Sequence, residues 1–310
     1  MNINLAIAER ARSGETLTVA EIDELGSSDI LSLGMLADEV RRARVGESVT
    51  FSRVLEIQGA SGAAGAAGAA GATGAAGAEV RLSQLPESLD DAEGLVAEAR
   101  MLAGPQLLTG FSLAEIVDRH WGKLAEVLKR LKRAGLNAIA EAPVDRLQDA
   151  EGALQACEDA GLPVRCLSLQ SPVSDGRSLW LVHVRTLLQK FPAIDTINPL
   201  SREQSIAVPT TGYDDVRAVA LARLALPSVK NIQVDWTQYG PKLAQVALTF
   251  GANDLDRVST SDDESLGKRR TSIEDVRRNI AAAGFTPVER VLSASFDSHR
   301  DGPPFTQDVP

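Results

Sequence analysis

Apolar side chains recur at helical spacing in the first fifty residues. The stretch TVAE, from Thr18 to Glu21, has the form of a capping box that opens a helix. Ser28 then precedes ILSLGMLADEVRRARVG, a second run with helical spacing, and Gly46 supplies a stop signal. The pattern predicts two helices over 18–45, within a helical N-terminal lead-in of residues 1–47.

From residue 48 onward, strand-like and helix-like segments alternate. The segment SVTFSRVLEIQ (48–58) alternates β-branched and apolar residues with polar ones, as a strand does. A low-complexity stretch at 59–77 follows, and the alternation then continues with short connections. Further strands are predicted at 79–83, 105–111, 137–142, 163–170, 193–200 and 231–236, and helices at 90–103, 112–135, 146–161, 178–191, 213–226 and 241–251.

Such alternation favours parallel strands joined by crossover helices. The seven candidate strands exceed what a small doubly wound sheet needs. We therefore predict an α/β fold, a TIM-type (β/α) barrel over 48–256 that is complete or lacks one strand. In such barrels the chemistry collects at the carboxyl ends of the strands.

The last part of the chain, residues 257–310, has a different character. The polar segment 256–272 is predicted as a loop, and 272–296 as an amphipathic helix followed by a short strand. The tail is rich in proline and polar residues. We expect a small C-terminal extension rather than another repeat of the barrel.

Composition narrows the classes of partner. The 310 residues are 44% hydrophobic and 24% charged, with a net charge of −10. Basic residues cluster only briefly, at 129–133 and 268–270, so we expect neither nucleic acid nor an anionic membrane as partner. The chain lacks a long apolar run and begins without a leader-like segment, which predicts a cytoplasmic protein.

Several segments resemble one known family. The most specific is GPKLAQVALTFGANDLD (240–256), which ends a longer matching stretch, 208–256. Residues 31–51, 110–116, 128–139 and 273–290 match in the same order. Together they resemble the radical S-adenosylmethionine enzymes of the futalosine route to menaquinone, which include aminofutalosine synthase and dehypoxanthine futalosine cyclase.

This resemblance implies a cofactor that the sequence does not support. The family holds a [4Fe-4S] cluster on three cysteines spaced CxxxCxxC, after the first barrel strand, and the open iron chelates S-adenosylmethionine. Here that loop reads GASGAAGAAGAAGATGAAG (59–77) and has no cysteine. The Gly-Gly pair that the family carries after its second strand is replaced by Ser83 and Gln84. We therefore expect neither cluster nor S-adenosylmethionine.

The chain's two cysteines and three histidines do not replace the missing ligands. Cys157 and Cys166 lie about a hundred residues from the loop and are expected to be buried small hydrophobes. The histidines fall at unrelated points without the spacing of a metal site, so no metal is predicted.

The 59–77 stretch has glycine at every third position. Three conformations stay open for it: a flexible linker, an alanine-driven helix weakened by its glycines, or a polyproline-II-like packing element. It has no phosphate-loop pattern.

Polar residues near strand ends are the candidates for ligand contact. Some have a structural explanation as well: Glu115 fits a capping box in SLAE, Asn198 can satisfy backbone groups, and Trp236 can pack against helices. Asn253 and Asp254 are predicted in a turn, bonded to local backbone. The candidates are Glu56, Glu115, Glu141, Asn198, Gln233, Asp235 and Trp236.

Two hypotheses for function follow. The first is a catalytically degenerate aminofutalosine synthase-like protein, without radical chemistry, that binds a small-molecule pathway intermediate or pairs with an active paralogue. The second is a cluster-independent enzyme that uses Glu56, Glu115 or Glu141 at the barrel mouth on a futalosine-like or related small molecule.

Overall fold

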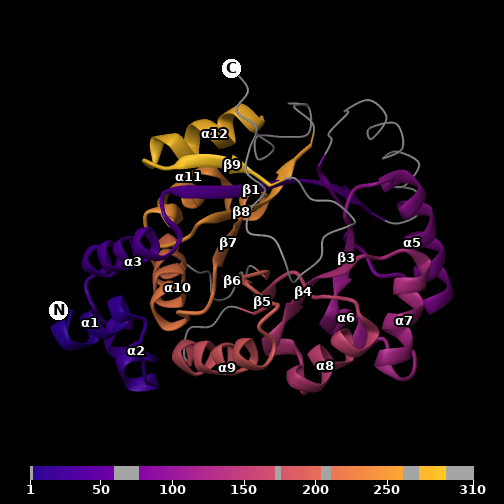
Figure 1. The fold of residues 1–310 in the computed structure, drawn as a ribbon, viewed down its shortest axis with the longest axis horizontal. Helices are drawn as coiled ribbons and strands as arrows, with labels where there is room; N and C mark the ends of the chain where they lie inside the picture. The colour runs from indigo at the N-terminus through magenta and orange to yellow at the C-terminus, as the bar shows by residue number, and fades with distance from the viewer. Residues whose placement is uncertain (1–2, 59–76, 172–175, 204–210, 261–271, 291–310) are drawn as a thin grey trace. The chain divides into compact units, whose positions relative to one another are not determined.

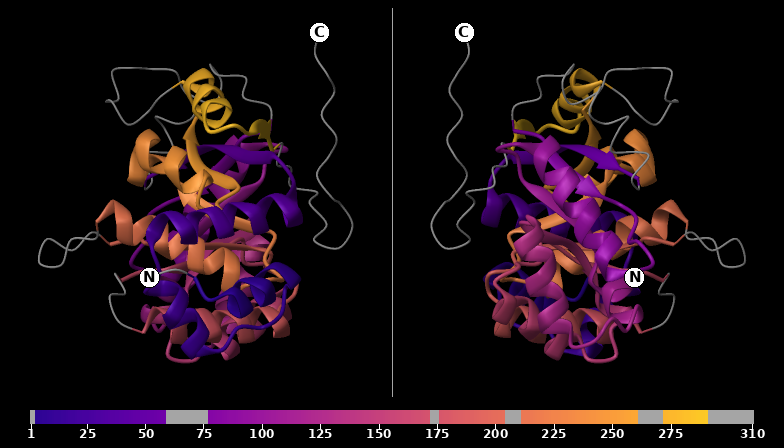
Figure 2. Two further views of the ribbon diagram at one scale, coloured as in Figure 1. Left: turned by 90° about the vertical axis from the view of Figure 1, so that its left-hand side faces the viewer. Right: turned by 90° about the vertical axis from the view of Figure 1, so that its right-hand side faces the viewer.

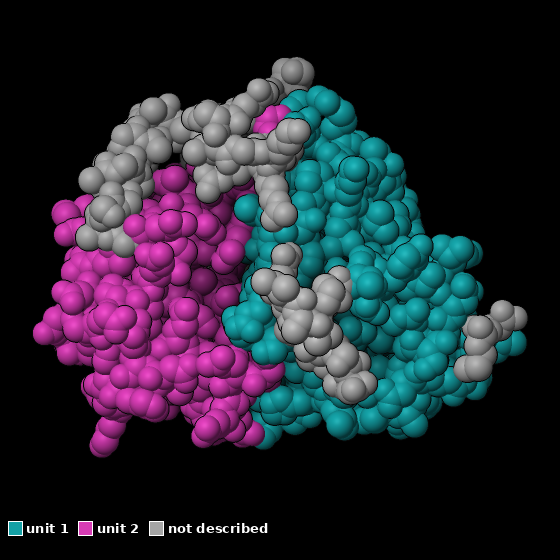
Figure 3. Space-filling model, turned by 180° about the vertical axis from the view of Figure 1, so that it is seen from behind, with its two compact units in different colours: residues 1–50, 166–256, 274–287 teal, residues 51–165, 257–273, 288–310 magenta. Residues whose placement is uncertain are grey.

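The computed structural model describes residues 3–58, 77–171, 176–203, 211–260 and 272–290. The three conformations weighed for the Gly/Ala stretch, and the predicted C-terminal tail, lie outside these residues. The chain divides into two compact units, which Figure 3 shows in different colours. Unit 1 is formed by residues 1–50, 166–256 and 274–287, and unit 2 by residues 51–165, 257–273 and 288–310.

Unit 1 begins with three helices: α1 (Leu5–Ser13), α2 (Val19–Gly26) and α3 (Ile30–Val45). The predicted capping box is confirmed, because the Thr18 hydroxyl accepts from the Glu21 amide and the Glu21 carboxylate accepts from the Thr18 amide. The cap of α3 is Asp29 rather than Ser28, and α1 was not predicted. Within the unit, α3 packs along α10 and α2 contacts α9 (Figure 2).

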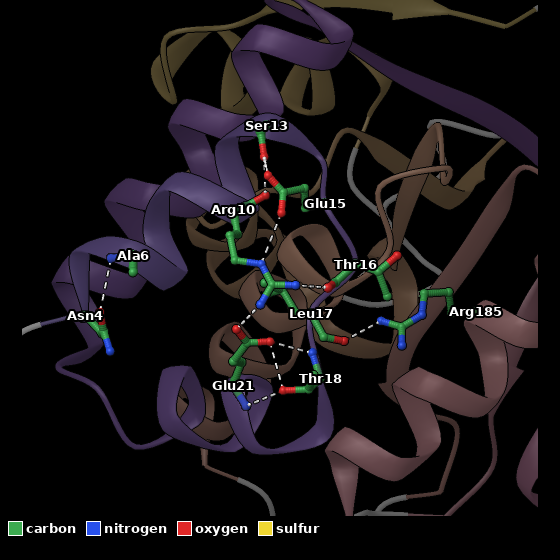
Figure 4. Close-up of polar contacts among 10 residues, drawn as sticks. All are labelled: Asn4, Ala6, Arg10, Ser13, Glu15, Thr16, Leu17, Thr18, Glu21 and Arg185. Carbon is green, nitrogen blue, oxygen red and sulfur yellow. Dashed lines mark hydrogen bonds and ion pairs between the residues drawn. The ribbon is translucent and has the colours of Figure 1, made fainter.

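Side-chain bonds tie these helices to the rest of unit 1, as Figure 4 shows. Arg10 bonds the carboxylates of Glu15 and Glu21 and the carbonyl of Thr16. Arg185, on α9, donates from Nη1 to the Leu17 carbonyl at 2.8 Å. The linker between α1 and α2 is therefore held by the guanidinium groups of Arg10 and Arg185.

The remainder of unit 1 is a run of parallel strands with intervening helices (Figure 1). Neighbouring strands pair in chain order, β5 with β6, β6 with β7, and β7 with β8. The elements are β5 (Leu167–Leu169), α9 (Arg177–Lys190), β6 (Thr196–Ser201), α10 (Gly212–Ala225), β7 (Asn231–Asp235), α11 (Trp236–Leu248), β8 (Asp254–Ser259), whose last residues fall in unit 2, and α12 (Ile273–Ala282).

Unit 2 repeats the same pattern with four earlier strands. β1 pairs with β2, β2 with β3 and β3 with β4, all in parallel. The elements are β1 (Ser48–Ile57), whose first residues belong to unit 1, β2 (Glu79–Leu82), α5 (Leu89–Ala103), β3 (Leu108–Ser112), α6 (Leu113–Asp118), α7 (Leu124–Ala134), β4 (Ala138–Pro143), the 3-10 turn η1 (Val144–Arg146), α8 (Ala150–Ala160) and the end of β9 (Thr286–Glu289).

The described residues thus contain eight parallel strands, β1 to β8, with a helix after each of β2 to β7. This arrangement is a TIM-type (β/α) barrel, and the predicted fold class is confirmed. The predicted C-terminal helix and short strand are α12 and β9.

Two sequence predictions are wrong around β8. Asn253 and Asp254 do not form a turn, and the predicted loop 256–272 begins inside this strand. Asn253 accepts from the Ile232 amide and the Arg223 guanidinium, and Asp254 accepts from Thr50 and Gln233. Their short polar side chains bond across strands instead of to local backbone, so the turn preference of Asx residues is overridden.

A third prediction is wrong at the end of β7. Trp236 does not lie in the strand but is the first residue of α11, because Asp235 caps that helix by accepting the Gln238 amide at 2.8 Å.

Among the described residues, no helix combines the length and the apolar character needed to cross a bilayer.

Candidate functional site

The strands of unit 1 have one apolar and one polar face. Ile197, Ile232 and Val234 are buried and alternate with polar residues on the other face. Register places Asn198 beside Gln233 and Gln233 beside Asp254. The polar face is therefore continuous across three strands, although its side chains are also buried.

Gln233 and Asp254 form a closed hydrogen-bond chain on this face. The Gln233 amide donates from Nε2 to Asp254 Oδ2 at 2.7 Å, and the Thr50 hydroxyl donates to Asp254 Oδ1 at 2.6 Å. Both carboxylate oxygens of this fully buried aspartate thus have a donor. Because both oxygens accept a hydrogen bond, the Asp254 carboxylate can be buried in the barrel wall.

Asn198 on β6 and Ser168 on β5 are buried polar residues whose hydrogen-bonding capacity is only partly used. Asn198 Oδ1 accepts the Leu200 amide at 3.0 Å, as the structural interpretation of this residue predicted. In the part of the chain that the structure describes, its Nδ2 and the Ser168 hydroxyl have no hydrogen-bond partner. Both side chains are fully buried, so each strand, β5 and β6, holds one buried polar atom without a partner among the described residues.

Asp235 lies at the end of β7 and serves a structural purpose. Besides capping α11, its Oδ2 is 3.1 Å from Arg202 Nη1, and both side chains are buried. Tyr239 donates to the Ser201 carbonyl at 2.6 Å, and burial raises the pKa of its phenol. Trp236 is buried as well, which agrees with a packing position.

Unit 2 carries its own polar strand face. Register places Glu56 beside Arg81, and Arg81 beside Thr109. Glu79 accepts from Arg81 Nε at 2.7 Å and from the Thr109 hydroxyl. Glu56 is paired separately, with its Oε1 3.2 Å from Arg257 Nε.

Glu115 and Glu141 interact in a second group. Burial raises the pKa of the Glu115 carboxyl, and the negative charge of Glu141 adds to the effect, while a hydrogen bond from the Ser112 amide opposes it. Glu115 still keeps solvent contact. Its bond to Ser112 is half of the predicted capping box, since the Ser112 hydroxyl makes no cap bond.

Two strained residues stand beside the candidate carboxylates of unit 2. Phe111 has φ 62° and precedes the Ser112 to Glu115 turn, and Arg257, the partner of Glu56, has φ 56°. A left-handed backbone at a bulky residue is uncommon and concentrates at functional sites. The strain supports a site at these strand ends without identifying its ligand.

The cysteines do not fit an iron–sulfur cluster. Cys157, in α8, is 2% exposed, and burial raises the pKa of its thiol to about 12. Iron binds the thiolate, which this environment disfavours. Cys166 is also buried and donates to the Leu167 carbonyl. Neither cysteine lies near residues 59–77 in the sequence, and two thiols are fewer than the three that a cubane of this kind needs.

A cavity of about 500 Å³ lies where β2 leads into α5. Gln84, one of the two residues that stand in place of the family's Gly-Gly pair, is part of its wall. Apolar and acidic side chains share the lining: Gln84, Leu85, Pro86, Asp90, Asp91, Gly94, Leu95 and Glu98.

Comparison with known proteins agrees with this fold and with the matched segments. Residues 188–300 match the family described as the CofH/MqnC C-terminal region. The chain is 30% identical over 212 residues to the 5-amino-6-(D-ribitylamino)uracil–L-tyrosine 4-hydroxyphenyl transferase of Archaeoglobus fulgidus. It is 28% identical over 221 residues to the aminodeoxyfutalosine synthase of Thermus thermophilus. This part of the chain is therefore similar to the C-terminal region of the CofH/MqnC family.

The matches cover part of each CofH/MqnC relative. They span 58% of this chain, with 62% of the Archaeoglobus protein and 58% of the Thermus protein. Among solved structures, HydG, a maturase of the [FeFe]-hydrogenase, has a TM-score of 0.66 at 13% identity, over 91% of this chain and 74% of that chain. At this identity the likeness shows the barrel fold alone.

The seven residues predicted for the site fall into separate groups. Asn198, Gln233 and Asp235 lie on one strand face of unit 1. In unit 2, Glu115 and Glu141 interact, whereas Glu56 pairs with Arg257. Sequence reasoning missed Glu79, Arg81 and Arg202, and it assigned Asp254 to a turn. For Glu79 and Arg81 the signal was available, since both lie inside a predicted strand at positions that alternate with apolar residues.

Proposed function

We propose that this chain, part of which is similar to the CofH/MqnC C-terminal region, binds a small polar molecule without an iron–sulfur cluster. The observation that carries the proposal is the composition of residues 59–77, which follow β1 and contain no cysteine. Glycine, alanine, serine and threonine offer iron no soft anionic ligand. The buried, protonated Cys157 does not compensate for this loss.

The polar strand faces support binding rather than mere loss of function. In a barrel that binds no ligand, replacing buried polar residues by apolar ones would increase the stability of the fold. Here Asn198, Gln233 and Asp254 are buried polar residues of unit 1, and Glu79 and Arg81 are buried polar residues of unit 2. Of these, Asn198 has an Nδ2 without a partner among the described residues, and this atom can donate to a polar ligand.

A second candidate function rests on Glu115 and Glu141. A carboxyl whose pKa is raised by burial and by a second carboxylate can act as a general acid. Glu56 does not join them, because Arg257 pairs with it. This enzyme hypothesis therefore depends on two carboxylates rather than on the three that the sequence suggested.

The proposed function is tested with iron-free protein and the compounds that the relatives' names supply. Thermal unfolding is measured with aminodeoxyfutalosine and with 5-amino-6-(D-ribitylamino)uracil, and with sucrose as a control for non-specific stabilisation. Binding at a hundredfold excess over Kd stabilises the folded chain by about 2.7 kcal/mol. We expect at least one compound to raise Tm in this way.

Two results oppose the proposal. No rise in Tm with either compound, together with co-purification of a cysteine-containing relative, points instead to a role as a partner protein. Turnover of either compound that is lost in the variants Glu115→Gln and Glu141→Gln supports the enzyme hypothesis.

A further inference from the structure

The cavity beside α5 involves none of the residues of the polar strand faces. Its volume of about 500 Å³ falls within the range of small-molecule sites. One wall is the connection from β2 to α5, with Gln84, Leu85 and Pro86, and the other wall is the helix itself. Both walls belong to unit 2, in which α5 packs on β2, β3 and α7 (Figure 1). The cavity is therefore a separate place in the fold where a ligand could bind.

The wall that the β2–α5 connection forms is held by the segment that follows α6. The Trp121 indole donates from Nε1 to the Glu87 carbonyl at 3.0 Å. Arg119 donates to the Glu87 carboxylate at 2.6 Å and to the Leu85 carbonyl at 3.2 Å. Because these bonds order the wall before any ligand arrives, they lower the entropic cost of binding there.

The helix wall of the cavity has charged ends and an apolar middle. Asp91, Leu95 and Glu98 follow the i, i+4, i+7 spacing and so share one face of α5. Leu95 is buried between the two exposed carboxylates, which lie about 10 Å apart along the helix axis. Gly94 contributes no side chain, and a Cβ added to it would have no atom within 4 Å. The middle of this wall is therefore open as well as apolar.

The two end charges have no basic partner among the described residues. Asp91 accepts from the Ser88 hydroxyl at 2.6 Å, which leaves its charge in place, and Glu98 makes no hydrogen bond or ion pair in this part of the chain. Asp90, the third acidic residue of the lining, differs because Arg130 Nη2 lies 2.6 Å from its Oδ1. Lysine and arginine are absent from the described lining. The cavity thus complements a ligand with two positive charges.

We propose that this cavity binds a linear aliphatic amine that carries an ammonium group at each end, a diamine or polyamine. The methylene chain packs on Leu85 and Leu95, and the ammonium groups pair with Asp91 and Glu98. The same two charges repel a carboxylate or a phosphate. The volume of the cavity favours a small molecule over a folded partner. This site goes beyond the proposed function and does not depend on it.

The test uses spermidine, whose chain ends in ammonium groups on both sides, and butylamine, which has one. Glu98→Gln removes the charge at one end of the cavity, whereas Gly94→Leu keeps every charge and fills the open middle. Glu158→Gln is the matched control, because Glu158 is an exposed residue of α8 that does not line the cavity. Each full-length protein is titrated with both amines by calorimetry, and thermal melting checks that it is folded. Gly94→Leu should melt no lower than the unaltered chain, since leucine favours a helix more than glycine does.

We expect spermidine to bind the unaltered chain more tightly than butylamine does. Its Kd should rise about threefold in Glu98→Gln, as the loss of one exposed ion pair predicts, and at least about tenfold in Gly94→Leu. Glu158→Gln should leave Kd unchanged. Absence of spermidine binding overturns the inference. Equal affinity in Gly94→Leu and the unaltered chain also overturns it, because the attraction would then be that of surface charge alone, and so does a Kd that rises equally in Glu158→Gln and Glu98→Gln.

Discussion

At the scale of single residues, the raised pKa of Glu115 can be tested through the pH dependence of stability. Burial raises the pKa of its carboxyl from the ordinary value of 4.5, and Glu141 adds repulsion. The folded state therefore holds this proton more tightly than the unfolded state. Stability falls as pH rises through the raised folded pKa, and the penalty is fully present above it.

Replacing Glu115 with Gln removes this penalty while keeping an oxygen for the Ser112 amide. The variant is expected to be more stable than the unaltered chain at pH 7, by well under about 1 kcal/mol because the side chain keeps solvent contact. The gain should vanish below about pH 4, where the carboxyl is protonated in both states. Thermal melts from pH 3.5 to pH 8 measure it, and a gain that is independent of pH would show that Glu115 has no raised pKa.

Single residues also show what the sequence could and could not predict. Asn198 was recognised as a partner for backbone groups, and its Oδ1 does accept the Leu200 amide, whereas ligand contact by this residue stays a prediction. Asp254 was missed because its partners, Thr50 and Gln233, are distant in sequence and meet it only when strands pair. Local turn preference carries no information about such partners.

At the scale of elements, β8 was the one barrel strand that the sequence did not predict. Its length is typical, but three of its six residues are charged, and charged residues are depleted in strands. The connection from α11 to β8 depends on Arg223 and Gly251. Arg223 donates from Nε to the Gly251 carbonyl at 2.8 Å, and its side chain lies too close to Gly251 to leave room for a Cβ there.

Gly251→Ala should therefore disturb the entry to β8. The glycine has φ +106°, and an added Cβ would lie 2.9 Å from Arg223 Cβ. Backbone strain and overpacking together should cost at least about 2 kcal/mol of unfolding free energy in urea melts.

A matched variant on α5 controls for the alanine itself. Gly94 lies inside that helix with nothing within 4 Å of an added Cβ, so Gly94→Ala should stabilise by about 0.5–1 kcal/mol. Equal effects of the two substitutions would refute the structural explanation of Gly251.

At the scale of the whole molecule, the fold was predictable because strands and helices alternate with short connections. The candidate site was less predictable from the sequence. Polar faces assemble from residues that are far apart in the chain, and the sequence identified the strands without fixing which atoms find partners. The division into two compact units, with β5 to β7 in one and β2 to β4 in the other, was likewise not visible in the pattern.

The central proposal concerns the whole chain and its cofactor: we propose that this chain works without the iron–sulfur cluster that its resemblance to radical S-adenosylmethionine enzymes implies. The most direct measurement is anaerobic reconstitution of the full chain with ferrous iron and sulfide, followed by desalting, iron and sulfide analysis, and EPR spectroscopy of the reduced protein. We predict iron far below one atom per chain, no cluster absorption and no EPR signal. About four irons and four sulfides per chain, with the EPR signal of a reduced [4Fe-4S] cluster, would contradict this account.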